Sequence, residues 1–157
     1  MRSVRQLVHL AVRRVHSARL LLAAALVICA PGIAAAITLP ASCTSFTDNP
    51  LVAGQTVIKA VHLTELRACI ADLRALEHLS APTWTDATIV AGTTVIKAVH
   101  ITELRAALAA VFTAVAAPAP TYTSTPASGV MIQAIHINEI RAAIAFLASW
   151  SQCNAST

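Results

Sequence analysis

Charged residues are scarce in this chain of 157 residues: 11% are Asp, Glu, Lys or Arg, against about 25% in a typical globular domain. Aromatic residues are scarcer still, at 4%, whereas 57% of the residues are hydrophobic. Disordered chains are poor in apolar residues and rich in charge, so this composition excludes charge-driven disorder. Only one segment approaches the ~20 apolar residues that a spanning helix needs, which argues against a polytopic membrane protein.

Sequence motifs for catalysis and cofactor binding are also missing. The chain has no glycine-rich phosphate loop, no nucleophile elbow and no Cys-x-x-Cys pair. Its serines and threonines lie outside any recognisable triad context. We therefore predict a protein that is not an enzyme and that holds no cofactor.

Positive charge is concentrated at the N-terminus. The formal net charge is +4, but five arginines precede residue 20, and six basic residues face seven acidic ones from Ile37 onward. The basic stretch leads into an apolar run at 20–36 that ends in Ala-Ala-Ala, which is the order of a secretory signal. We expect residues 1–36 to be a signal peptide and residues 37–157 to form one secreted or surface-exposed domain. Because the excess basic charge belongs to this leader, no nucleic-acid partner is expected.

Three alternatives to simple cleavage after Ala36 stay open. One alternative is that the leader is not cleaved and anchors the protein in a membrane, and membrane contact is expected only in that case. Cys43 is a candidate for lipid attachment. The Arg13-Arg14 pair is a candidate twin-arginine signal.

One sequence unit then occurs three times. FTDNPLVAGQTVIKAVHLTELRACIADLR begins at Phe46, WTDATIVAGTTVIKAVHITELRAALAAVF at Trp84, and the shorter YTSTPASGVMIQAIHINEIRAAIAFL at Tyr122. These aromatic residues are spaced 38 and 38 residues apart, whereas the histidines of the units are spaced 38 and 36. The third unit has therefore lost two residues before its helix, as a degenerate terminal repeat does.

Each unit contains an irregular arm followed by a helix. Pro, Gly, Asn and Thr mark the arm, and apolar residues at helical spacing predict helices at 59–78, 97–116 and 133–150. One unit alone cannot bury its apolar face. We therefore predict an all-α domain of three repeats, at about 46–81, 84–119 and 122–150, packed as a small bundle or a short solenoid. The aromatic residues Phe46, Trp84 and Tyr122 are expected to pin each arm onto a helix.

A polar set, His-x-x-Glu-x-Arg, recurs in every helix. Its members are His62, Glu65, Arg67, His100, Glu103, Arg105, His136, Glu139 and Arg141. His and Glu at i and i+3 share a helix side and can ligate a metal or pair a base with an acid. A catalytic set, however, usually joins different residues at one point. We predict that the histidines are hydrogen-bonded in the core and that the Glu and Arg side chains form ion pairs, with no catalytic or metal site. A site where the three histidines meet on an axis is the alternative.

Two aspartates in the arms have two interpretations. Asp48 and Asp86 are candidate calcium ligands, but the residues that follow lack the alternating oxygen ligands of a calcium loop. The structural interpretation is helix capping or a salt bridge to a repeat arginine. Lys59 and Lys97 stand at helix starts, where positive charge is unfavourable, which hints at an arm carboxylate or a partner.

Three cysteines remain once Cys29 leaves with the signal. We expect a disulfide between Cys43 and Cys69, because Cys69 lies on the core side of the first helix and Cys43 lies on the arm that returns to it. The alternative Cys43–Cys153 bond would require the ends of the repeat array to meet, and hence a closed bundle.

The segment VIKAVHLTELR resembles the tandem units of secreted, mostly uncharacterised bacterial proteins over about residues 46–147. A more distant resemblance is to the dockerin half-repeat, in which a calcium loop leads into a similar helix. In that comparison His62, His100 and His136 occupy the place of the acidic residue that closes the loop. The resemblance implies the shape of each unit, an arm, a glycine and a helix that packs against its copies. The export signal, the repeats and the lack of a non-repeated polar cluster predict a structural or protein-interaction module at or outside the cell surface. The alternative is a docking module that tethers partners in an extracellular assembly without calcium.

Overall fold

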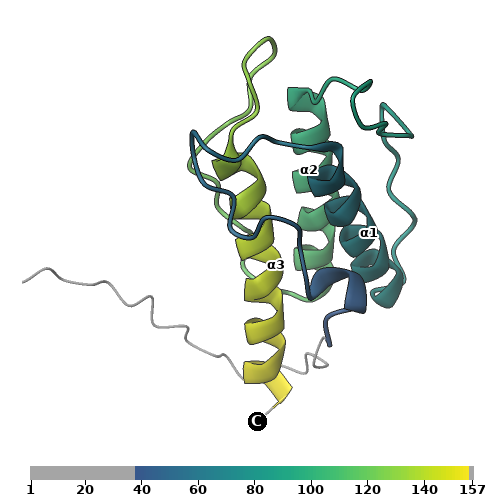
Figure 1. Ribbon diagram of the computed structural model, residues 1–157. Helices are drawn as coiled ribbons and strands as arrows, with labels where there is room; N and C mark the ends of the chain where they lie inside the picture. Colours follow the sequence, from purple (N-terminus) through teal and green to yellow (C-terminus); the bar gives the residue numbers. More distant parts are fainter. Residues whose placement is uncertain (1–37, 156–157) are drawn as a thin grey trace, which may run out of the picture.

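The computed structural model describes residues 38–155 and their side chains as far as Trp150, so the predicted signal peptide and the Cys153 side chain lie outside the described residues. This part of the chain contains helices and no strands (Figure 1). The elements are a short 3-10 helix η1 (Ala41–Cys43), α1 (Ala60–Leu76), α2 (Ala98–Ala114) and α3 (Ala134–Ala155). The all-α prediction is confirmed. None of the described helices is long and apolar enough to cross a membrane.

The three helices lie side by side and run in the same direction (Figure 1). Each arm therefore runs back along the bundle from the C-terminal end of one helix to the N-terminal end of the next. Leu63, Leu66, Ile70 and Leu73 of α1 are fully buried, as are the matching residues of α2 and α3. The arms add Leu51, Ile89 and Ile132 to the same core. One hydrophobic core thus joins all three units.

The first two helices end earlier than the sequence predicts. α1 ends at Leu76 and α2 at Ala114, two residues before the predicted ends. The cause is a left-handed residue after each helix, because His78 and Ala116 both have φ 54°. The amide that follows Ala116 donates to the Phe112 carbonyl at 2.9 Å, which is the bond of a Schellman motif. The α3 helix instead continues past its predicted end at Trp150.

The left-handed Ala116 provides a stability test. A side chain at positive φ costs about 1 kcal/mol that glycine avoids. We expect Ala116→Gly to raise the free energy of unfolding by about 0.5–1 kcal/mol, measured by urea denaturation. The control Ala109→Gly, inside α2, should lower it by about 1 kcal/mol. Destabilisation by Ala116→Gly would contradict this account of the helix end.

Cys43 and Cys69 form a disulfide that ties η1 to α1, as the sequence predicts. The bundle is nevertheless closed, since the third unit returns to the first. The Asn138 side chain of α3 accepts a hydrogen bond from the Leu51 amide at 3.1 Å and donates to the Leu51 carbonyl at 2.8 Å. A closed bundle therefore does not need the alternative Cys43–Cys153 bond. Contacts between the first arm and α3 close the bundle without it.

Candidate functional site

The three histidines of the polar set are buried at the third residue of their helices, where His62 and His100 are fully buried and His136 is 3% exposed. The Nδ1 atom of each ring accepts a hydrogen bond from the backbone amide three residues earlier, at 3.1–3.2 Å. An accepting Nδ1 carries no proton, so the proton of the neutral ring lies on Nε2. Each histidine therefore caps the start of its helix by accepting this amide bond, and its Nε2–H group points toward the arm of the same unit.

In the first two units, an aspartate of the arm contacts the histidine Nε2 atom. The Asp48 Oδ2 atom lies 3.2 Å from His62 Nε2 and 2.9 Å from Lys59 Nζ, and Asp86 makes the same two contacts in the second unit. Hydrogen bonds from Lys59 and His62 hold the pKa of Asp48 below its ordinary value. Bonds from His100 and Lys97 do the same for the pKa of Asp86. The aspartates thus neutralise the lysines at the helix starts, and the expected capping or arginine salt bridge is not their role.

In the third unit, neutral residues replace both the aspartate of the arm and the lysine at the helix start. Ser124 stands in place of the aspartate and Gln133 in place of the lysine. The Ser124 hydroxyl lies 2.9 Å from His136 Nε2 and keeps the contact with the arm. Because a serine replaces the aspartate here, burial dominates and lowers the pKa of His136, and the charge of Arg105 lowers it further against the opposing effect of Glu139.

These shifts predict the effect of acid. A lowered pKa keeps His136 neutral in the folded state, while the unfolded chain takes up a proton as the pH falls through about 6.5. Stability contributed by His136 is therefore present above pH 6.5 and lost below it. The aspartate contributions are lost only as the pH falls below about 3.8. We expect the melting temperature to drop between pH 7 and 5, and His136→Asn to reduce that drop. An unchanged pH profile in His136→Asn would contradict this assignment.

The glutamates of the polar set hold the arms from a second direction. The backbone amides of Thr47, Thr85 and Thr123 donate to the glutamate carboxylate of the same unit at 2.7–3.0 Å. Each threonine hydroxyl donates to that carboxylate as well. Glu103 and Glu139 also lie 3.8 and 3.0 Å from an arginine of the preceding helix. Glu65 of α1 lies 3.8 Å from Arg141 of α3. The ion pairs in this set therefore join neighbouring units.

The arginines extend the same pattern around the bundle. Arg67 donates to the Asp86 carbonyl at 2.7 Å and lies over the Trp84 ring at 4.7 Å. The equivalent contacts of Arg105 are to Ser124 and Tyr122. Arg141 returns to the first unit, where it donates to the carbonyls of Thr47 and Asp48 at 2.9 and 3.1 Å and lies over the Phe46 ring at 5.0 Å. We call this closed cycle of arginine contacts the arginine ring.

The polar set is thus spread around the bundle instead of converging on one point. Among the side chains that the structure describes, no group of three or more His, Cys, Asp or Glu is placed to hold a metal ion. Sequence reasoning missed Asn138 and the contacts of the arm threonines with the glutamates, since it considered Thr47 and Thr85 only as caps of a helical turn in the arm. The threonines had a signal, since Thr47 and Thr85 each precede their glutamate by 18 residues. Asn138 had none, because the other units have threonine there.

A second candidate surface is apolar and exposed. Among the residues whose side chains are described, seven of the eight exposed large hydrophobic ones lie at the arm ends and helix starts, at one end of the bundle. They are Val52, Val57, Val90, Val95, Val130, Met131 and Ile135. Three of these residues are equivalent in the three units, because each lies three positions before the first residue of its helix. They are Val57, Val95 and Met131, which are 72%, 71% and 84% exposed. We call these three residues the apolar tips.

Comparison of the chain with protein-family models, curated proteins and solved structures finds no match.

Proposed function

We propose that this chain is an exported, non-catalytic helical-repeat protein that acts as a structural or protein-interaction module at or outside the cell surface. The apolar tips carry the proposal. Their exposure recurs in all three units, although other positions of the third unit have changed. Exposed apolar residues gathered at one end of a small domain are typical of an interaction surface. The partner is an extracellular protein that covers this end.

Two features support export. The N-terminal sequence has the basic, apolar and small-residue order of a secretory signal. The Cys43–Cys69 disulfide suits an oxidising compartment, because such bonds persist outside the cytosol. Both features favour a domain that works after translocation.

The absence of catalysis is proposed from what the polar set does. Every repeated histidine, glutamate and arginine bonds to an arm, to a helix start or to a neighbouring unit. Side chains engaged in this way hold the fold, whereas a catalytic group must face a substrate in a productive geometry. The arginine ring and the histidines therefore serve to present the apolar tips on a rigid frame.

A dockerin-like docking module is the second candidate. It rests on the resemblance of the units to dockerin half-repeats, and it would operate without calcium. Asp48 and Asp86 are already bonded to a lysine and a histidine, so a cation would have to displace a charged partner. We expect calcium and a calcium chelator to leave the melting temperature unchanged. A chelator-sensitive melting temperature would instead indicate a calcium-dependent module.

Site-specific photo-crosslinking tests the main proposal. A photoreactive amino acid is placed at Val57, Val95 or Met131 of the full chain, and at exposed Leu76 near the other end as a control. We expect one discrete crosslinked protein from the three tip positions and none from Leu76. With the photoreactive residue at Met131, we expect Val57→Ser with Val95→Ser to abolish the crosslink. Equal crosslinking from Leu76 would contradict the proposed surface. A crosslinked dimer of this chain would identify the tips as a self-association site.

A further inference from the structure

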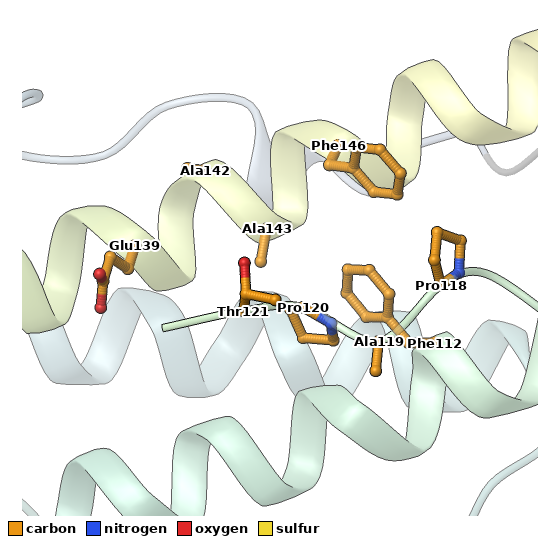
Figure 2. A pocket seen from close by; sticks show the side chains of 9 residues that line it. All are labelled: Phe112, Pro118, Ala119, Pro120, Thr121, Glu139, Ala142, Ala143 and Phe146. Carbon is orange, nitrogen blue, oxygen red and sulfur yellow. The ribbon is translucent and has the colours of Figure 1, made fainter. Parts of the chain in front are cut away.

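A cavity of about 340 Å³ lies between α2, α3 and the segment that joins them (Figure 2). Its walls are Phe112 of α2, residues 118–121 of the connecting segment, and Ala142, Ala143 and Phe146 of α3. Glu139 closes one end. This volume falls at the lower end of the range for small-molecule sites.

The position equivalent to this cavity in the second unit lies between α1 and α2. There a side chain of the protein, that of Arg74, joins the connecting segment to α2. By the 38- and 36-residue spacing of the units, Ser80 corresponds to Pro118 and Ala107 to Ala143. Arg74 spans these two positions, because its Nε donates to the Ser80 carbonyl at 2.9 Å and its Nη1 donates to the Ala107 carbonyl at 3.1 Å.

The equivalent place in the first unit, where the first arm lies against α1, is bridged as well, by different chemistry. Cys43 corresponds to Ala119 and Cys69 to Ala143, and the disulfide joins them. Beside it the Ser42 hydroxyl donates to Asp72 at 2.6 Å. These two residues correspond to Pro118 and Phe146.

The cavity between α2 and α3 is therefore the one equivalent position left unbridged. Within the described residues, neither a hydrogen bond nor a disulfide joins 118–121 to 142–146. Ala119 and Ala143 stand in place of the two cysteines, and Pro118 stands in place of the serines. Phe112 and Phe146 stand in place of Arg74 and Asp72, so apolar side chains replace the groups that make polar bridges elsewhere. An apolar ligand would supply here the contacts that the chain supplies at the other two positions.

The walls indicate the chemistry of that ligand. The Phe112 and Phe146 rings are parallel within 6° with centroids 6.1 Å apart, and Pro118 and Pro120 also line the cavity (Figure 2). Aromatic rings stack favourably against such surfaces. The Glu139 oxygens are already taken by Thr123 and by Arg105, so no free charge remains to pair with an ion. We propose that this cavity binds a small, uncharged aromatic molecule.

The test uses N-phenyl-1-naphthylamine, a neutral aromatic probe that fluoresces in apolar sites, with the full mature chain. We expect saturable binding of one probe per chain, displaced by indole. Ala142 lines the cavity and is exposed, so Ala142→Phe should fill the cavity without disturbing the core and weaken binding at least about 10-fold. The matched control Ala106→Phe changes the equivalent exposed residue of α2 and should leave the affinity unchanged.

The outcomes separate this proposal from the proposed function. Methyl NMR shifts at Ala143 on probe addition would support the cavity as the site. Absence of saturable binding, or equal affinity in Ala142→Phe and the wild type, would overturn the proposal. Loss of binding in Val57→Ser with Val95→Ser, but not in Ala142→Phe, would assign the probe to the apolar tips and also overturn it. None of these results alters the crosslinking test of the tips.

Discussion

Replacement of Arg141 by Met should lower the free energy of unfolding by about 3 kcal/mol or more, because a buried ionic network loses its cation. Arg141 is 5% exposed. Its guanidinium donates to the carbonyls of Thr47 and Asp48 and lies 3.8 Å from Glu65. Without it, two backbone carbonyls of the first arm and the Glu65 carboxylate of α1 lose a partner in the third unit. Urea denaturation measures the loss.

Arg74→Met is the matched control, since Arg74 also donates to two backbone carbonyls. That side chain is less buried and joins neighbouring units in sequence, so its loss should cost about 1 kcal/mol. Equal small losses in the two variants would show that Arg141 contributes no more than a surface arginine and would contradict the closed arginine ring.

Removal of the disulfide should have the second largest effect. The bond closes a separation of 26 residues, which corresponds to about 3–4 kcal/mol in the chain-entropy model. We expect the paired substitution Cys43→Ala with Cys69→Ala to lower the free energy of unfolding by that amount. Dithiothreitol should lower the melting temperature of the wild type and leave that of the variant unchanged. A wild-type melting temperature insensitive to the reductant would contradict a stabilising role for this bond.

Much of the fold follows from local patterns. Apolar residues at helical spacing predicted the three helices, whose first residues lie one position after the predicted starts. The unfavourable Lys59 and Lys97 at the helix starts indicated a nearby carboxylate, and the arms supply it. The disulfide pairing followed from the core position of Cys69, which the repeat comparison revealed.

The connections between units could not be predicted in the same way. A repeated arginine at a fixed position is compatible with contacts inside its own unit or to either neighbour, and local spacing does not choose among them. Closure depends on Arg141 and Asn138, which meet residues 87–94 positions away. The helix ends were misplaced because alanine and histidine adopt a left-handed conformation that glycine usually takes. The cavity depends on how α2, α3 and the segment between them pack together, which no local pattern in the sequence specifies.

Solution NMR of the full mature chain tests closure most directly. The account predicts nuclear Overhauser effects between the side-chain amide of Asn138 and the backbone amide of Leu51, and between the Arg141 side chain and the Phe46 ring. These pairs lie 87 and 95 positions apart in sequence and come together only in a closed bundle. If the corresponding effects between Arg67 and Trp84 are seen while both of these are absent, the three units form an open stack and the arginine ring does not exist.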